Sequence, residues 1–291
     1  MRTHVSSVGL LVRSDPALSF IYPEHIPRAC LDALPAQPGI YIFRDEAGVA
    51  IYVGKSVNIR HRVLSHLRTP EEMQMLQATR HIDFERCGGE IGALLRESQL
   101  IKQLQPVYNQ KLRRLREMCS LRLTEAGLDV VFARDCDFAR TEGLYGFYAS
   151  RKGALEALDG LAQAAGLCSA LIALEKVVPG RPCFARQLGR CGGACVGVES
   201  VQAHNARIAV ALAALRVAPW PFPGAVGIVE ESEGYRQVHL VDHWCYLGPR
   251  PDGRSGKGKT REAATAFDID VYNILARPLL QGELLVEAIP V

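Results

Sequence analysis

Apolar residues in the first third of the chain follow two different periods. Short apolar runs at 40–43 and 50–53 flank a turn-forming segment at 45–48, and this arrangement predicts a β-hairpin. Between 56 and 67 the apolar residues recur at every fourth position, which predicts a helix because that spacing returns to the same helical face. The expected buried face consists of Ile59, Val63 and Leu67.

A second short helix, a strand at 81–87 and a helix at 90–104 are expected after this first helix. Pro106 cannot continue a helix, so it limits the last of these elements. The resulting β-β-α-α-β-α unit ends near Asn109. The residues expected on one face of its last helix are Leu94, Glu97, Ile101 and Leu104.

The remaining sequence predicts further units. We expect a hairpin at 120–133, a helix at 152–165 and an Ala-rich helix at 200–216. The proline-rich segment 219–223 marks a boundary, beyond which two strands precede two short helices. The whole is predicted to be an α+β protein of four parts. These are an N-terminal extension with a short helix at 1–35, a small antiparallel sheet with helices at 36–112, a linker hairpin with helices and a cysteine-rich region at 113–217, and a small α+β C-terminal domain of unknown role at 218–291.

Composition is that of a globular protein, with 48% hydrophobic and 22% charged residues in a chain of 291. The apolar stretch 8–12 is too short for a membrane span or a signal peptide, so we expect a cytoplasmic protein. Net charge is +3, but 55–116 holds 12 Lys or Arg against 6 Asp or Glu, which is +6 and leaves −3 for the remainder. This asymmetry suits a protein that lays one part on a polyanion.

Several polar side chains of the hairpin and the following helix suit phosphodiester cleavage. Tyr41 and Tyr52 lie on the two facing strands, although tyrosine is also an ordinary strand residue. Lys55, Arg62 and His66 are spaced by seven and four, so we expect them on one face of the helix or at its entry. Cations stabilise charge that develops on phosphoryl oxygens, and a phenol or an imidazole can move a proton.

Glu97 is the candidate metal ligand. A carboxylate in a mostly apolar helical face is costly unless it meets a cation. A bound Mg²⁺ would satisfy it and activate a water for attack on phosphorus. The alternatives are a Glu97 paired with a nearby Arg, and a metal bound by Glu90, which lies seven residues earlier and is equally suited to a helix start.

Five separated blocks spread over about 70 residues resemble a known family. The blocks are Gly39-Ile40-Tyr41, Tyr52-Val53-Gly54-Lys55-Ser56, Asn58-Ile59-Arg60 with Arg62, Glu97, and Gln105-Pro106-Val107-Tyr108-Asn109. They match the signature of the GIY-YIG nucleases in the form found in the excinuclease UvrC. The resemblance implies that 36–112 is a GIY-YIG nuclease domain and that the chain cuts DNA with the help of Mg²⁺ or Mn²⁺.

The resemblance also assigns roles to individual residues. Glu97 binds the divalent metal, Tyr41 and Tyr52 flank the attacking water, and one of these tyrosines, helped by Lys55, is the general base. The phosphoryl group is stabilised by Arg62, and the site is supported by Asn109.

His66 departs from the resemblance, because UvrC-type sites usually carry a tyrosine at this place. An imidazole could hydrogen-bond a phosphate or take a proton, or it could be an ordinary surface histidine; its helical face favours a role. A basic run follows Asn109 and predicts contacts to the DNA backbone that do not read sequence, with a solvated surface as the alternative. The candidate DNA-binding residues are Arg60, Lys111, Arg113, Arg114 and Arg116.

Nine cysteines without an export signal argue against disulfides. Four of them, Cys168, Cys183, Cys191 and Cys195, fall in one 28-residue stretch. Four thiolates suit tetrahedral zinc or an iron–sulfur cluster, and the lack of CxxC pairs favours the cluster. The blocks 181–184 and 188–197 resemble the cysteine-rich region of UvrC, which implies a [4Fe–4S] cluster. Four reduced cysteines without metal are the alternative.

Residues 253–260 satisfy the P-loop pattern GxxxxGK[ST]. That motif requires a strand running into its first glycine and a parallel α/β domain around it. Pro249 and Pro251 precede the segment and only 31 residues follow it, so no such domain fits. We interpret it as a basic loop and expect no nucleotide cofactor.

The chain is too short for the UvrB-binding segment, the second nuclease domain and the helix-hairpin-helix tail of UvrC. In this it resembles the short UvrC-like excinucleases that make a single 3′ incision. The resemblance implies a repair enzyme that acts on damaged double-stranded DNA presented by UvrB after loading by UvrA. The alternatives are a non-repair GIY-YIG endonuclease that cuts undamaged DNA, and a non-catalytic DNA-binding module with a structural cluster.

Overall fold

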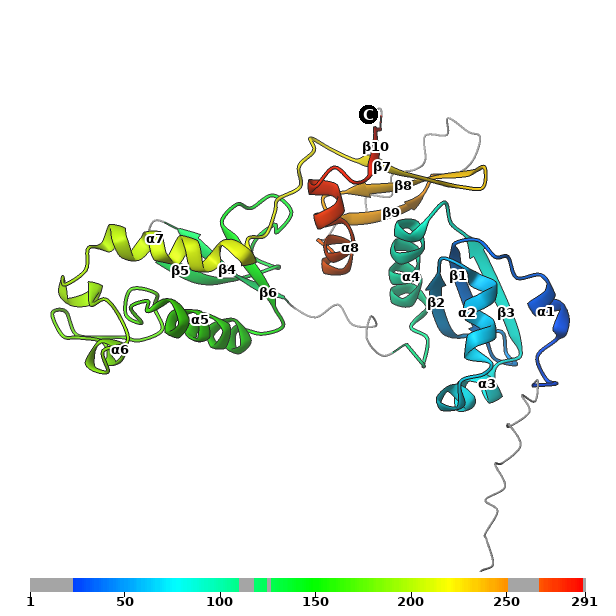
Figure 1. Ribbon diagram of the computed structural model, residues 1–291, viewed down its shortest axis with the longest axis horizontal. Helices are drawn as coiled ribbons and strands as arrows, with labels where there is room; N and C mark the ends of the chain where they lie inside the picture. Colours follow the sequence, from blue (N-terminus) through cyan, green and yellow to red (C-terminus); the bar gives the residue numbers. More distant parts are fainter. Residues whose placement is uncertain (1–22, 110–117, 125–126, 251–266, 290–291) are drawn as a thin grey trace, which may run out of the picture.

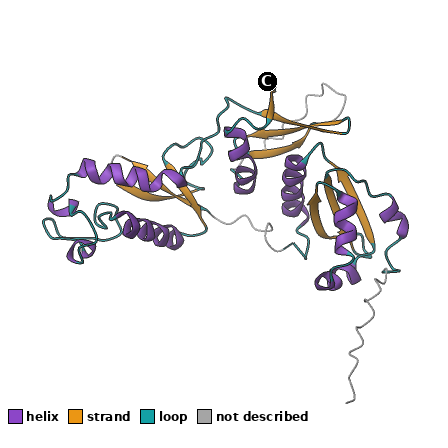
Figure 2. Cartoon of the chain, viewed as in Figure 1, coloured by secondary structure: helices purple, strands orange, loops and turns teal. Residues whose placement is uncertain are grey.

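The computed structural model describes residues 23–109, 118–124, 127–250 and 267–289. Its described part contains three antiparallel sheets accompanied by helices, which confirms the α+β class (Figure 2). Figure 1 shows helix α4 between the first and third sheets, while the second sheet and its helices lie at the opposite end of the molecule from the first sheet. No helix in the described ranges is both long and apolar enough to cross a membrane.

The first sheet has the strand order β2-β1-β3. Its strands are β1 (Gly39–Arg44), β2 (Ala50–Ser56) and β3 (His81–Arg86). One face is covered by α1 (Arg28–Asp32), α2 (Ile59–His66), the 3₁₀ turn η1 (Pro70–Glu72) and α3 (Met73–Ala78). The opposite face is covered by α4 (Glu90–Leu104).

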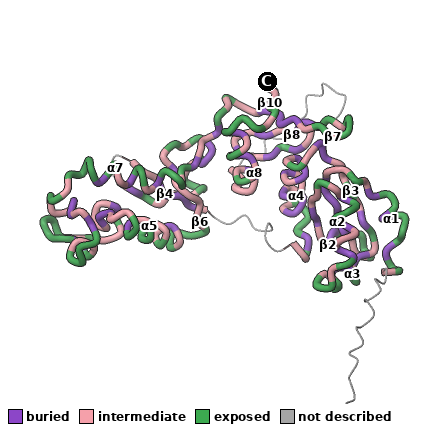
Figure 3. The backbone as a smooth tube through the Cα atoms, viewed as in Figure 1, coloured by how far each residue is buried: buried purple, intermediate pink, exposed green. Residues whose placement is uncertain are grey.

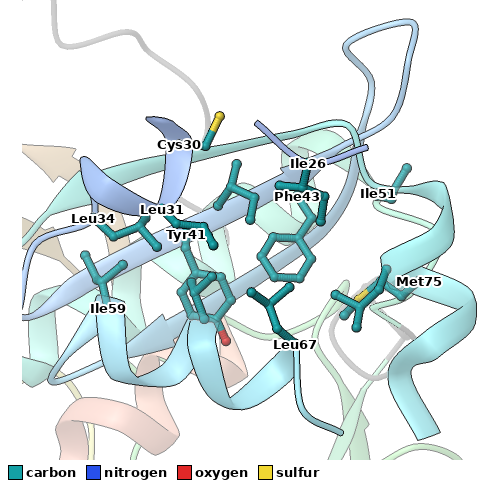
Figure 4. Packing of buried hydrophobic residues seen from close by; sticks show 13 residues of the cluster. Ile26, Cys30, Leu31, Leu34, Tyr41, Phe43, Ile51, Ile59, Leu67 and Met75 are labelled. Carbon is teal, nitrogen blue, oxygen red and sulfur yellow. The ribbon is translucent and has the colours of Figure 1, made fainter. Parts of the chain in front are cut away.

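The central strand β1 explains why both faces are covered. Successive side chains of a strand point to opposite faces, so Tyr41 and Phe43 enter the cluster below α1, α2 and α3 (Figure 4). Ile40 and Ile42 enter the second cluster, against α4. The uninterrupted apolar run at 40–43 is therefore the pattern of a strand buried on both sides.

Helix α4 begins and ends where the sequence predicts, but its predicted single apolar face is wrong. Leu104 is 40% exposed, whereas Leu95, which lies outside that face, is fully buried. The reason is that α4 packs on two sheets at once: Leu100 and Ile101 contact the first sheet, and Leu95 belongs to the core of the third. Figure 3 shows buried positions along this helix.

The second sheet has the order β5-β4-β6. Its strands are β4 (Cys119–Thr124), β5 (Gly127–Phe132) and β6 (Leu144–Tyr148). Its core includes residues of α5 (Arg151–Ala165) and α7 (Val201–Leu212), while the short helix α6 (Phe184–Gln187), the 3₁₀ turn η2 (Ala194–Val196) and the 3₁₀ turn η3 (Ala213–Leu215) lie in the connections. Strand β6 was not predicted, because Gly146 interrupts it with a φ of +68° and its pairing with β4 is irregular.

The third sheet has the order β10-β7-β8-β9. Its strands are β7 (Val226–Ser232), β8 (Tyr235–Asp242), β9 (Cys245–Pro249) and β10 (Leu285–Ala288), and it is packed against α8 (Ile269–Leu280). Among the described residues beyond β8 there are one helix and two further strands, and Val271, Leu275 and Leu279 form the buried face of that helix. The two strands were not predicted, and residues 251–266, where a second helix would have to lie, are outside the described part of the chain.

The helix predicted at 56–67 begins at Ile59, because Asn58 caps its first turn and Ser56 still belongs to β2. The P-loop-like segment 253–260 lies outside the described residues, as do four of the candidate DNA-binding residues. These four are Lys111, Arg113, Arg114 and Arg116.

Candidate active site and cysteine cluster

A cavity of about 410 Å³ opens where β2, the start of α2 and the first two turns of α4 meet. It gathers two phenols, two cations and two carboxylates, all of which the sequence singled out. The lining residues are Tyr41, Tyr52, Lys55, Ser56, Val57, Arg62, Glu90 and Glu97. Residues up to 56 positions apart in sequence therefore line one cavity, because strand pairing and helix packing bring them together.

Glu97 lies on the face of α4 that looks towards β2. Its Oε1 accepts a hydrogen bond from the backbone N–H of Lys55 at 3.0 Å. Burial raises the pKa of Glu97, and that N–H opposes the rise by stabilising the carboxylate. The predicted alternative of a paired arginine is not what the described residues show, because the neighbouring Arg96 pairs with Glu85 instead.

Glu90 occupies the rim of the same cavity. Its Oε1 accepts a hydrogen bond from Nζ of Lys55 at 2.5 Å, and its side chain is 54% exposed. Lys55 therefore contacts both carboxylates, one through its backbone and one through its ammonium group. Two carboxylates that face one polar hollow match the way Mg²⁺ is bound, through one or two carboxylates with water completing the shell.

Tyr41 lines the cavity and joins a chain of hydrogen bonds that is buried at His66 and partly exposed at its far end. Its hydroxyl lies 2.6 Å from Nε2 of His66, and Nδ1 of His66 contacts the carboxylate of Glu72. Burial lowers the pKa of His66, against the effect of Glu72, so the imidazole is neutral near pH 7. Since a carboxylate only accepts, Nδ1–H donates to Glu72, and Nε2 accepts from Tyr41.

His66 does not face the cavity as expected, because its side chain is 1% exposed and lies behind Tyr41. Glu72, its partner, was not predicted. It is the last residue of the 3₁₀ turn η1, outside any helical repeat of the preceding helix, so no periodicity pointed to it. The imidazole, for which a phosphate contact and a proton-transfer role were both open, links the hydroxyl of Tyr41 to the half-buried carboxylate of Glu72.

The second tyrosine and the arginine lie nearer to solvent. The Tyr52 ring centroid is 6.1 Å from that of Tyr41. Burial raises the pKa of both phenols, so neither is a phenolate near pH 7, and the charge of Arg62 opposes the rise in each. Arg62 is exposed and close enough to both rings to act on them electrostatically.

The two remaining described candidates lie outside the cavity. Asn109 makes two hydrogen bonds of 2.8 Å with the backbone of Val53, through its Oδ1 and its Nδ2, so it holds the strand that carries Tyr52 and Lys55. Arg60 is exposed on α2, where it can reach solvent or a ligand.

The four predicted cysteines converge in the connection between α5 and α7. The Sγ atom of Cys183 lies 3.7 Å from that of Cys168 and 3.6 Å from that of Cys191. The backbone N–H of Cys183 donates to Sγ of Cys195 at 3.4 Å. Burial tends to raise the pKa of Cys183, but the backbone N–H of Arg186 and the neighbouring thiols lower it overall, which favours a thiolate.

This cluster fits a metal by its donor chemistry. Three of its sulfur atoms, those of Cys168, Cys183 and Cys195, lie within 4.8 Å of one another. Four thiolates around one tetrahedral zinc ion, with bonds of about 2.3 Å, would stand about 3.8 Å apart. The observed spacing is close to that value. A four-iron cluster, in which each thiolate binds its own iron, needs the sulfur atoms further apart.

Comparison with known proteins covers most of the chain. The model of the UvrC-like GIY-YIG domain matches residues 37–110, that of the UvrC/Cho excinuclease middle domain matches 118–214, and that of the excinuclease Cho C-terminal domain matches 225–291. The chain is 45% identical to excinuclease cho of Escherichia coli K12 over 269 residues, which are 92% of this chain and 90% of that protein.

Two more distant similarities were found. UvrABC system protein C of Methanosarcina acetivorans is 31% identical over 190 residues, which are 64% of this chain and 36% of that protein. The crystal structure of the GIY-YIG N-terminal endonuclease domain of UvrC from Thermotoga maritima, bound to magnesium as its catalytic divalent cation, is 30% identical. It covers 28% of this chain and 94% of that one, with a TM-score of 0.27.

Proposed function

This chain belongs to the family of excinuclease Cho, and from that premise we propose that it makes the 3′ incision beside bulky lesions during nucleotide excision repair. It is an endonuclease with a UvrC-like GIY-YIG domain. The finer proposal is that UvrA loads UvrB, that UvrB presents damaged double-stranded DNA, and that one phosphodiester bond is then hydrolysed. The observation that carries the hydrolysis step is the cavity shared by Tyr41, Tyr52, Lys55, Arg62 and Glu97. The roles of UvrA and UvrB are proposed from the sequence resemblance. We also propose that 36–112, 113–217 and 218–291 act as nuclease, cluster and C-terminal domains.

Glu97 is the ligand that we propose for Mg²⁺ or Mn²⁺, with Glu90 able to hold a metal-bound water. A desolvated carboxylate with a raised pKa, facing a polar hollow, is the oxygen donor that such hard cations prefer. When bound, the ion supplies a more acidic water and neutralises charge on the phosphate. Lys55 holds both carboxylates in place through its backbone N–H and its ammonium group.

We propose Tyr41 as the general base, acting together with His66. Because burial raises the pKa of Tyr41, it cannot lose its proton to solvent near neutral pH. It can accept a proton from water only while its own proton passes to Nε2 of His66, 2.6 Å away. The imidazolium formed is stabilised by the carboxylate of Glu72, as in other sites where a carboxylate orients a histidine.

The other candidates take supporting roles in this proposal. Arg62 neutralises charge on the phosphoryl oxygens, and Tyr52 helps to orient the water between the two rings. Asn109 keeps β2 in register with the cavity through its two bonds to Val53. The residues proposed to contact backbone phosphates are Arg60, Lys111, Arg113, Arg114 and Arg116.

For the cysteine cluster we propose a [4Fe–4S] centre, which the sequence resemblance implies, with zinc as the competing occupant. The sulfur spacing of 3.6–3.7 Å suits a single ion, so a four-iron centre requires the thiolates to separate. Gly189, Gly193 and Gly197 adopt positive φ angles in this segment and give it backbone freedom for such a movement. We propose a structural role, because the cluster lies in the connection between two core helices.

An incision assay tests the nuclease proposal. The substrate is a duplex with one bulky adduct, labelled separately at each end, incubated with UvrA, UvrB and Mg²⁺. Wild type should give one 3′ nick, and Glu97→Gln should lose it. The matched control is Glu231→Gln, which changes an exposed carboxylate on β7 and should cut normally.

The same assay separates the alternatives. Cutting of adduct-free DNA without UvrA and UvrB would contradict the repair role and favour a nuclease of undamaged DNA. Absence of cutting on either substrate, by folded protein with an intact cysteine centre, would leave a DNA-binding module.

A further inference from the structure

The start of helix α4 is capped by a residue that lies far away in sequence. A helix leaves its first N–H groups without internal acceptors, and the N-cap residue Gly89 has no side chain to supply one. Glu230 of β7 does so instead. Its Oε1 accepts from the N–H of Ile91 at 2.9 Å, and its Oε2 accepts from the N–H of Gly92 at 2.6 Å.

The electrostatics of this contact are those of an anion at a helix start. Partial positive charge at the N-terminus of a helix stabilises a carboxylate there. Burial raises the pKa of Glu230, and the two backbone N–H groups oppose that rise. The two N–H groups thus offset the cost of burying the charged carboxylate. Removing that charge should weaken the attachment of α4 to β7.

Three glycines make the approach of β7 and β8 to α4 possible. A Cβ atom at Gly88 would lie 2.6 Å from the backbone oxygen of Glu230, and one at Gly89 would meet the carboxylate of Glu230. A Cβ at Gly92 would lie 2.5 Å from Cε1 of His239, with Nε2 closer still. The sequence Cys87-Gly88-Gly89-Glu90-Ile91-Gly92 is therefore shaped to receive the third sheet.

Further contacts bind the same helix to the C-terminal domain along its length. The N–H of Gly88 donates to Oε1 of Gln237 at 3.1 Å. Leu95 is fully buried in the cluster that contains Ile228 and Trp244. At the far end of α4, Nζ of Lys102 pairs with Asp268 and with Asp270, each at 2.6 Å. Figure 1 shows α4 between the two sheets that it joins.

Glu97 projects from this clamped helix into the nuclease cavity. It follows Gly92 by five residues, which is about 7.5 Å along the axis of a helix. Ligands of Mg²⁺ must lie within a narrow range of distances, and a shift of about 1 Å at a reacting centre can cost about a hundredfold in rate. Glu97 can therefore hold its place beside the N–H of Lys55 only while α4 itself is held.

We propose that Glu230 is a positioning residue of the nuclease reaction, through which the C-terminal domain holds α4 and sets Glu97 for metal binding. This inference rests on the proposed role of Glu97 as the metal ligand. It gives residues 218–291 a function within the nuclease site itself, in addition to any contact with DNA or protein.

The test measures metal binding by the full-length protein without DNA, using electron paramagnetic resonance of Mn²⁺. The variants are Glu97→Gln, Glu230→Gln and the neighbouring Glu231→Gln as the matched control. Glu230→Gln should weaken Mn²⁺ binding about tenfold, the usual effect of removing a group that supports a metal ligand. The Mg²⁺ concentration for half-maximal incision should rise by the same factor, and Glu231→Gln should match wild type.

A structural role alone would give a different result. It would lower the melting temperature of Glu230→Gln and leave both metal measurements unchanged below that temperature, which would overturn the proposal. If Glu230→Gln does not fold, Glu230→Asp keeps the charge but is one methylene too short to reach both N–H groups, and the same predictions apply to it with smaller shifts.

The same variants distinguish a failure of the Glu97 metal assignment from a failure of the Glu230 proposal. If Glu97→Gln binds Mn²⁺ as wild type does, the metal assignment itself is wrong. If Glu97→Gln loses Mn²⁺ while Glu230→Gln retains wild-type affinity, the metal assignment stands and the positioning role of Glu230 is wrong.

Discussion

The substitution Gly92→Ala should destabilise the protein, although alanine is the better helix former. The new Cβ would lie 2.5 Å from Cε1 of His239 and 2.9 Å from Oε2 of Glu230, whereas ordinary contacts begin at 3.4 Å. The imidazole is 1% exposed, and buried side chains are closely packed, so it cannot move aside without displacing its neighbours. Helix and sheet must therefore separate by about 1 Å.

The expected cost follows from two effects. Forcing an extra methyl group into a packed interface costs about 1–3 kcal/mol. Weakening the charged hydrogen bonds from Ile91 and Gly92 to Glu230 adds about 1.5–3 kcal/mol, and the helix propensity of alanine returns about 1 kcal/mol. We expect a net loss of about 1.5–5 kcal/mol in the free energy of unfolding.

Urea denaturation followed by circular dichroism measures this loss. The matched control is Gly160→Ala in α5, where a Cβ meets nothing within 4 Å. That substitution should stabilise by about 0.5–1 kcal/mol, because alanine loses less backbone entropy in a helix. Replacing glycine by alanine is thus expected to lower the free energy of unfolding at one helical position and to raise it at the other.

A double-mutant cycle tests the cause. In a His239→Ala background the main obstacle is gone, so Gly92→Ala should cost markedly less than it does in wild type. If Gly92→Ala is as stable as wild type, or if its cost is the same in both backgrounds, then β8 does not press on α4 as described. The close approach would then not explain the glycine.

Three further predictions concern proton transfer, acid stability and the metal centre. His66→Gln keeps a hydrogen-bonding group but cannot take a proton, so the single-turnover incision rate should fall about a hundredfold with unchanged half-activating Mg²⁺, and a wild-type rate would exclude the relay through Glu72. Burial lowers the pKa of His239 from 6.5 to about 4, so between these pH values the unfolded chain binds a proton that the folded protein does not bind. The free energy of unfolding should therefore show no loss from His239 above pH 6.5 and should fall by up to about 3 kcal/mol towards pH 4. Urea midpoints of His239→Asn should fall less over the same range, and an equal fall would contradict the assignment. Cys183→Ser should lose iron and sulfide in elemental analysis while Cys136→Ser keeps them, and stoichiometric zinc in wild type would replace the [4Fe–4S] proposal.

Much of the nuclease unit could be predicted from the sequence, because its signals are local. The hairpin is predicted by a turn segment between two apolar runs, and the end of α4 is predicted by Pro106. Most residues lining the cavity, among them Tyr41, Tyr52 and Glu97, belong to blocks whose order and spacing were already visible. The four clustered cysteines were recognisable for the same reason, since their residue type and close spacing left few other uses.

The sequence also determined the class of chemistry, but not how each group is placed. His66 was assigned to the cavity by its helical position, yet it lies behind Tyr41 because Glu72 and the packing below β1 draw it inward. The choice of Tyr41 as the proposed base depends on that contact.

Only the tertiary structure could pair α4 with the C-terminal sheet. Glu230 follows Gly92 by 138 residues, and no period or motif links positions so far apart. Local sequence signals indicate which secondary structure a segment forms by itself. The acceptor of a free N–H group at a helix start, and the element that packs against a glycine, are determined only when separate elements pack together. For this reason the sequence predicts a helix that begins at Glu90, but only the fold shows that Gly88, Gly89 and Gly92 form a surface on which the third sheet packs.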